Sequence, residues 1–249
     1  MQIQKLSWAG IKVVCGNKTV LIDAVENFKP YLPVLGKPRS DVFIFSPTTT
    51  ADYILFTHLH LDHFDMEVID KCLKPEGKII ANKKLQHQIP VHNHECIFLD
   101  VDQSITENGI TFKSVFSLDG IGEEQTAWIL DFNGTKIFHG GDTIWHNQFW
   151  KIGKENPDID YAFLPVNGAV VNFQIVGLEY SSIPASLTPS RPSMQPNFCM
   201  QKNHTNSLWN VRITLYQPIE LDQTVFEELS RNIHQPMQIL NDADYLTPN

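Results

Sequence analysis

The sequence predicts an α/β domain in which two packed, mixed β-sheets are flanked by helices. Three observations support this fold class. Short runs of β-forming residues come in groups, segments with helical patterning interrupt the groups, and no linker divides the chain. A length of 249 residues with 42% hydrophobic residues is sufficient for one large domain with a substantial core. We therefore expect residues 1–249 to form a single domain.

The first part of the chain is expected to be mainly β structure. Strands are predicted at 3–8, 11–15 and 19–22, where β-forming residues are concentrated. Residues 28–50 are rich in Pro, Ser and Thr, and we expect them to form a loop or flap over the site. Residues 53–57 form a short apolar run, which is the pattern of a buried strand.

Helices and strands then alternate. Helices are predicted at 66–73, 83–88, 147–154 and 224–232. Strands are predicted at 78–81, 95–99, 110–116, 125–132, 136–139, 161–164 and 237–240. Residues 174–215 do not fit this alternation, because Pro, Ser, Asn, Gln and Met are crowded there and apolar periodicity is poor.

Composition excludes some classes of function. A net charge of −9 argues against a nucleic-acid partner, because the phosphate backbone would be repelled. A small anionic substrate stays compatible, since a bound metal can reverse the local field. The four cysteines form no Cys-x-x-Cys pair, so neither a thiolate zinc site nor a disulfide framework is indicated.

The N-terminus and the hydropathy indicate where the protein acts. The first residues lack the basic start and apolar run of a signal peptide, and no stretch is apolar enough to span a bilayer. We therefore expect a cytoplasmic protein with a small-molecule substrate and no membrane span. A homo-oligomer is compatible with the sequence.

Three histidines and two carboxylates lie within nine residues directly after the expected strand 53–57. The segment reads Thr-His-Leu-His-Leu-Asp-His-Phe-Asp, and imidazole and carboxylate are good ligands for zinc, manganese and iron. Residues two apart in extended chain point the same way, so His58 and His60 can hold one ion together. Asp62 and His63 can face a second ion as the chain turns. A run of surface histidines would not explain polar side chains at the end of a buried strand.

The pattern His-x-His-x-Asp-His after an apolar strand resembles the signature of the metallo-β-lactamase superfamily. That family has an αββα sandwich fold with its metals at one edge of the two sheets. Residues 138–143 resemble the family's Gly-Asp-Thr segment, which implies that Asp142 bridges two metal ions. The resemblance implies one or two zinc ions, with manganese or iron as alternatives.

Further motifs resemble a subgroup of bacterial metal-dependent hydrolases related to ascorbate-6-phosphate lactonase and N-acyl-phosphatidylethanolamine phospholipase D. They are Leu-Pro-Val-Asn-Gly at 164–168, Asp-Gly-x-Gly-x-x-Gln-x-x-Trp at 119–128, and Trp145-His146. The resemblance covers 1–173 well and 215–240 loosely. It implies hydrolysis of an ester, lactone or phosphodiester by a metal-activated water. Asp62 would orient or deprotonate that water, and His146 would contact substrate or metal. Thr57, Asp23 and His139 could fix the orientation of the ligands.

Two departures from the family pattern affect the metal site. Most members supply a third histidine to the first metal near 117–119, where this chain has Ser-Leu-Asp. We favour Asp119 as a metal ligand or as a residue supporting one, and the alternative is that Asp119 caps the turn before Gly120. The family's last ligand is a histidine in a pattern like Pro-x-His-Tyr-Gly, which this chain lacks. The alternative function is therefore a degenerate protein of this fold, with an incomplete second metal site and little or no catalysis.

The missing histidine has a candidate explanation in the anomalous segment. Reverse translation of 203–209 with permitted codons, read one base later, allows the string Thr-Ile-Pro-Ile-His-Tyr-Gly. We hypothesise that residues near 190–214 come from a compensated frameshift, and the alternative is a genuine divergent insertion. The nucleotide sequence of the gene tests this hypothesis, because codons incompatible with the shifted reading would exclude the frameshift.

Overall fold

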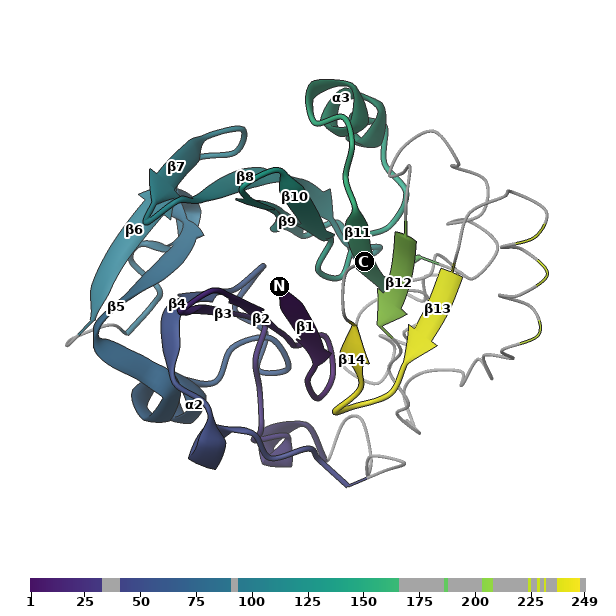
Figure 1. Cartoon of the computed structure of the whole chain (residues 1–249). Coiled ribbons are helices and arrows are strands. Elements are labelled where there is room, and N and C mark those ends of the chain that lie inside the picture. The colour runs from purple at the N-terminus through teal and green to yellow at the C-terminus, as the bar shows by residue number, and fades with distance from the viewer. Residues whose placement is uncertain are drawn as a thin grey trace, which may run out of the picture.

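Two seven-stranded β-sheets face each other in the part of the chain that the structure describes (Figure 1). The structure is a computed structural model, and it describes residues 1–32, 41–90, 94–165, 186–187, 203–207, 224, 228, 231 and 237–246. The expected single domain over 1–249 stays a prediction, because most of 174–215 lies outside these residues.

The first sheet carries the strand that leads into the histidine segment. Its order is β14-β1-β2-β3-β4-β5-β6. The pairs from β1 to β3 are antiparallel, and those from β3 to β6 are parallel. The strands are β1 (Gln2–Lys5), β2 (Ile11–Cys15), β3 (Lys18–Ile22), β4 (Ala51–Leu55), β5 (Leu73–Asn82), β6 (Glu95–Leu99) and β14 (Tyr245–Leu246).

The second sheet has the order β13-β12-β11-β10-β9-β8-β7. It is antiparallel from β7 to β10 and parallel from β10 to β13, so both sheets are mixed, as predicted. The strands are β7 (Ser104–Glu107), β8 (Ile110–Leu118), β9 (Glu124–Phe132), β10 (Thr135–His139), β11 (Tyr161–Pro165), β12 (Asn203–Ser207) and β13 (Met237–Leu240). Strand β12 lies inside the segment for which the sequence predicted no element.

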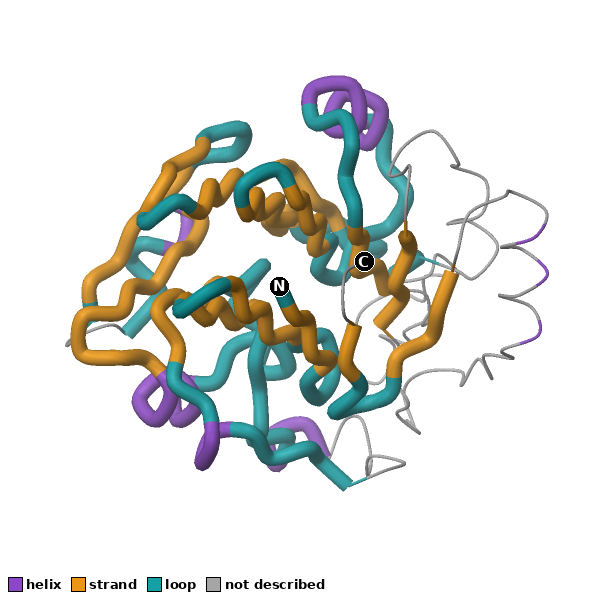
Figure 2. The backbone as a smooth tube through the Cα atoms, in the orientation of Figure 1, coloured by secondary structure: helices purple, strands orange, loops and turns teal. Residues whose placement is uncertain are grey.

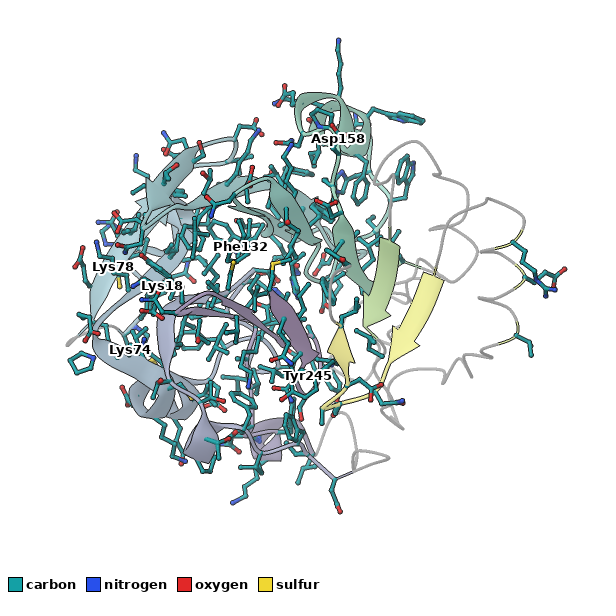
Figure 3. All side chains as sticks on the ribbon, in the orientation of Figure 1. Lys18, Lys74, Lys78, Phe132, Asp158 and Tyr245 are labelled. Carbon is teal, nitrogen blue, oxygen red and sulfur yellow. The ribbon has the colours of Figure 1, made fainter. Side chains whose placement is uncertain are left out.

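The main hydrophobic core lies between the two sheets. Alternation along β4 places Tyr53 and Leu55 in this core and turns Ile54 to the outer face. Figure 3 shows Phe132 of the second sheet in the space between the sheets, where it is 4% exposed. Each large side chain buried in this way contributes roughly 1.5–3 kcal/mol, so the core fixes how the sheets pack.

Helices cover the outer faces of the sheets (Figure 2). Helix α2 (Met66–Cys72) packs Val68 and Ile69 against the first sheet, and α3 (Gln148–Glu155) packs Phe149 and Ile152 against the second. The layers are therefore helix, sheet, sheet, helix, which confirms the predicted fold class. Three 3₁₀ turns are η1 (Lys29–Tyr31), η2 (Ser46–Thr48) and η3 (Lys83–Leu85).

Several element boundaries differ from the prediction. The strand expected at 3–8 ends at Lys5, because the chain turns and the Leu6 backbone N–H donates to the Gly10 carbonyl oxygen. The helix expected at 83–88 is only the 3₁₀ turn η3, and β7 was not predicted because its residues are mostly polar. Of the helix expected at 224–232, only 224, 228 and 231 are described, and these three are helical.

Two further sequence expectations concern membranes and thiols. Among the described residues, no helix combines the length and the apolar character needed to cross a bilayer. The described cysteines, at positions 15, 72 and 96, are free thiols.

The two sheets are joined at the edge where the parallel strands β3 and β4 end. The Trp128 indole of β9 donates to the carbonyl oxygen of Phe56 at 2.9 Å. The Thr126 backbone N–H donates to the carbonyl oxygen of Thr57 at 3.0 Å. Because these bonds hold the chain directly after β4, they fix the start of the histidine segment.

Candidate metal centre

Three imidazoles converge in the loop that follows β4. The backbone N–H of His63 donates to the His60 carbonyl oxygen at 2.8 Å, and this turn brings His63 back toward His58. The ring centroids of His58 and His63 lie 4.0 Å apart, and those of His58 and His60 lie 4.4 Å apart. His58 and His63 are buried, whereas His60 is partly exposed.

Each ring directs one nitrogen toward the centre of the cluster. His58 Nε2 and His60 Nδ1 are 3.0 Å apart, and His63 Nε2 lies 3.2 Å from Asp142 Oδ2. Among the described residues, two sets have potential ligand atoms within 4.8 Å of one another: His58, His60 and Asp62 form one, and His58, His63 and Asp142 form the other. The structure thus brings together five of the six residues predicted to bind metal.

The outer nitrogen of each ring has an oxygen partner. Such partners fix the orientation and the tautomer of imidazoles that bind metals. They are Thr57 Oγ1 for His58 Nδ1 at 3.0 Å, Asp23 Oδ2 for His63 Nδ1 at 2.8 Å, and Glu123 Oε2 for His60 Nε2 at 3.0 Å. Every ring therefore keeps its second nitrogen directed to the interior of the cluster.

Asp23 is the buried carboxylate beneath the cluster. It follows β3 with a φ of 47° and accepts hydrogen bonds from the backbone N–H and the hydroxyl of Thr57, both at 2.8 Å. Burial opposes ionisation, but the charge and hydrogen bond of His63 outweigh it, and the pKa of Asp23 is lowered. Asp23 was expected from the sequence to help orient the metal ligands, and the parallel pairing of β3 and β4 brings it next to the loop after β4.

The charges of the cluster suit a cation. Burial opposes protonation of His63, but the carboxylates of Asp142, Asp23 and Asp62 outweigh it and raise the pKa of His63 well above its ordinary value. Burial, with neighbouring histidines, lowers the pKa of His58 well below its ordinary value, so this ring is neutral as a ligand must be. A divalent cation would compensate the same carboxylates, and the donor set fits zinc, manganese or iron.

Asp62 is held by a residue far away in the sequence. Its Oδ2 accepts a hydrogen bond from Trp8 Nε1 at 3.0 Å, while its Oδ1 is buried without a hydrogen-bond partner among the described residues. Burial raises the pKa of Asp62. The structure groups Asp62 with His58 and His60, whereas Asp62 and His63 were expected to face a second ion together.

Asp142 enters the cluster from the second sheet, just after β10. Its backbone N–H donates to Gln125 Oε1 at 3.2 Å. Gly141, with a φ of 63°, passes so close to Thr57 that a Cβ would lie 2.8 Å from the Thr57 Cβ. This close approach explains the glycine in the Gly-Asp-Thr segment. The bridging role of Asp142 between two ions stays a prediction.

Asp119 does not join either set of potential ligands. Its Oδ1 accepts the backbone N–H groups of Ile121 at 3.0 Å and Glu123 at 2.7 Å. Burial raises the pKa of Asp119. The geometry therefore favours the alternative in which Asp119 caps the turn between β8 and β9, and its role as a ligand stays a prediction.

His146 is buried in an aromatic stack. Its ring lies parallel to Phe149 at 4.2 Å between centroids and edge-on to Phe116 at 5.0 Å. Neither ring nitrogen has a hydrogen-bond partner among the described residues, and burial lowers the pKa of His146 to about 4. His146 is outside both sets of potential ligands, so its predicted contact with substrate or metal remains untested.

Two side-chain contacts of the cluster, made by Trp8 and Glu123, were not predicted from the sequence. Trp8 had been assigned to a strand, and nothing in the sequence indicates its bond to Asp62. Glu123 lies within the 119–128 motif, but its spacing alone does not indicate a bond to His60. His139, which was expected to help orient the ligands, donates from Nε2 to the Ala9 carbonyl oxygen at 2.9 Å and supports the loop that carries Trp8.

The chain is similar to a known protein family and to proteins named metal-dependent hydrolase. Residues 18–175 match the family described as beta-lactamase superfamily domain. A UPF0173 metal-dependent hydrolase of Saccharolobus solfataricus is 28% identical over 174 residues, which cover 67% of this chain and 72% of that protein. A second UPF0173 metal-dependent hydrolase, of Lysinibacillus sphaericus, is 27% identical over 244 residues, which cover 93% of each chain.

Solved structures share the fold. An isothiocyanate hydrolase from Delia radicum gut bacteria has a TM-score of 0.73 at 15% identity, covering 99% of each chain. Igni18, a metallo hydrolase from Ignicoccus hospitalis, has a TM-score of 0.70 at 12% identity, covering 98% of this chain and 97% of its own. At such identities the likeness shows the fold and leaves the substrate open.

Replacing Asp119 by Asn tests the two roles of this residue. The amide oxygen can still accept the two backbone N–H groups, so we expect zinc affinity, measured by chelator competition, to be retained while stability falls by about 1 kcal/mol. A loss of affinity of roughly tenfold or more would contradict a role confined to capping the turn.

The buried His146 predicts a pH dependence of stability. Its pKa is about 4 in the folded chain against 6.5 ordinarily, so the unfolded chain takes up a proton first as the pH falls. The stability from this site is complete above about pH 6.5 and is lost toward pH 4. In EDTA, lowering the pH from 7 to 5 should cost wild type about 2 kcal/mol more than His146→Phe. Denaturant unfolding measures this, with exposed His87→Phe as the control; equal losses in wild type and His146→Phe would contradict it.

Proposed function

Because the chain belongs to the beta-lactamase superfamily, we propose that it is a metal-dependent hydrolase acting on an ester, lactone or phosphodiester. The observation that carries the proposal is the convergence of imidazole nitrogens and carboxylates at the edge of the two sheets. The relatives named metal-dependent hydrolase support the same reaction class.

The proposed metal ligands are His58, His60, Asp62, His63 and Asp142, with zinc as the first choice of ion. Bound there, a divalent ion would supply a water with a pKa of about 7 and positive charge for a developing oxyanion. Thr57, His58 and Gln125 also line a cavity of about 40 Å³, which has room for a water molecule beside the cluster.

Asp62 is proposed to orient the attacking water and to accept its proton. One carboxylate oxygen is fixed by Trp8, and the other is buried with no hydrogen-bond partner among the described residues. Because burial raises the pKa of Asp62, the carboxylate is a stronger base than an exposed one. The Trp8 hydrogen bond would keep this carboxylate from rotating during the reaction.

His146 is proposed to contact the substrate from the loop after Asp142. A neutral imidazole has one donor and one acceptor nitrogen, and both are without partners among the described residues. Stacking on Phe149 fixes the plane of the ring. The ring can therefore donate a hydrogen bond to a substrate oxygen at neutral pH without adding positive charge.

The double variant His58→Ala, His60→Ala tests the proposal. We expect it to lose bound metal, measured by elemental analysis, together with hydrolysis of a panel containing 4-nitrophenyl esters, lactones and bis(4-nitrophenyl) phosphate. His87→Ala, at an exposed position, is the matched control and should keep both.

The number of metal ions bound per wild-type chain separates the hydrolase from the degenerate protein. Two ions per chain with turnover of one substrate class would support the hydrolase. Metal content unchanged in the double variant would contradict the assigned ligands. One ion or none, with no turnover across the panel, would favour the degenerate protein.

A further inference from the structure

Glu123 contacts the candidate metal centre but has no role in the proposed chemistry. Its Oε2 lies 3.0 Å from His60 Nε2. We propose that Glu123 is a positioning residue that holds the Nε2–H of His60, so that Nδ1 of this ring faces the metal. The proposal rests on the proposed function only in that the cluster holds a metal ion.

The proton on His60 decides which nitrogen can bind. A neutral imidazole carries one proton, and the nitrogen without it supplies the lone pair for a metal. A carboxylate beside Nε2 keeps the proton there, which leaves the lone pair on Nδ1. His60 Nδ1 is the atom that lies 3.0 Å from His58 Nε2. These two nitrogens could therefore bind one ion together, as expected from the sequence.

The turn between β8 and β9 places Glu123 rigidly. Asp119 Oδ1 accepts the Glu123 backbone N–H at 2.7 Å, and the Asp119 backbone N–H donates to the Glu123 carbonyl oxygen at 3.2 Å. Three residues later, Thr126 is bonded to Thr57 in the metal loop. Asp119 therefore acts on the metal centre through Glu123, at the place where most of the family has a histidine ligand.

The contact between His60 and Glu123 is exposed, so its role in metal binding can be tested without disturbing the fold. The side chains of His60 and Glu123 are 39% and 50% exposed, and such surface pairs contribute little to stability. Replacement of Glu123 should therefore leave the fold intact. By contrast, Thr57 and Asp23, which hold the other two rings, are buried.

Glu124 is a matched control beside Glu123. Its side chain is 55% exposed, and its carboxylate forms an ion pair with Lys84. A change at Glu124 removes the same charge from the adjacent position without removing the bond to His60. It therefore separates ring positioning from the general effect of a negative charge.

The experiment compares zinc affinity and the His60 tautomer in Glu123→Ala, Glu123→Gln and Glu124→Ala. By chelator competition, Glu123→Ala should lower zinc affinity about 10–100-fold, while Glu124→Ala should stay within about twofold. Glu123→Gln should retain most of the affinity, because its amide oxygen can accept the same N–H. In long-range ¹H–¹⁵N spectra of the zinc-loaded chain, His60 should carry its proton on Nε2 in wild type and lose this preference in Glu123→Ala.

Three outcomes would overturn the positioning role. They are unchanged affinity in Glu123→Ala, an unchanged His60 tautomer in that variant, or equal losses in Glu123→Ala and Glu124→Ala. If the wild type itself bound no zinc, both this role and the proposed function would fail. If the wild type bound zinc with the affinity of Glu123→Ala, only the positioning role would fail.

Discussion

The hydrogen bonds on the outer nitrogens of three imidazoles determine the geometry of the candidate metal centre. Thr57, Asp23 and Glu123 each hold one ring from outside, and the remaining nitrogens consequently face one another and Asp142. Without these bonds the rings could rotate and exchange tautomers, and a buried cluster with several carboxylates would lack a fixed arrangement. A cation at the centre would compensate charges that are costly to bury separately.

The fold provides these partners from separate parts of the chain. Parallel pairing of β3 and β4 brings Asp23 next to the histidine loop, and the second sheet supplies Glu123 and Asp142 from the ends of neighbouring strands. Bonds from β9 to the chain after β4 lock the two sheets together at this edge. The site therefore depends on the packing of both sheets, although its histidines are contiguous in sequence.

The αββα layers and most strands could be predicted from the sequence, because alternation of apolar residues and turn composition are local signals. The histidine segment was recognisable for the same reason, since its candidate ligands lie close together in the sequence. Trp8 and Glu123 could not be assigned, because their bonds to Asp62 and His60 depend on how distant loops pack. Asp119 illustrates the limit: its turn was an open alternative in the sequence, and only the hydrogen bonds favour it.

A crystal structure of the zinc-loaded chain, with anomalous diffraction data collected at the zinc edge, tests the central claim most directly. The account predicts an anomalous peak within bonding distance of His58 Nε2 and His60 Nδ1, with the outer nitrogens of all three rings still bonded to Thr57, Asp23 and Glu123. Absence of a peak from this cluster, with the imidazoles turned apart and separated by water, would contradict it.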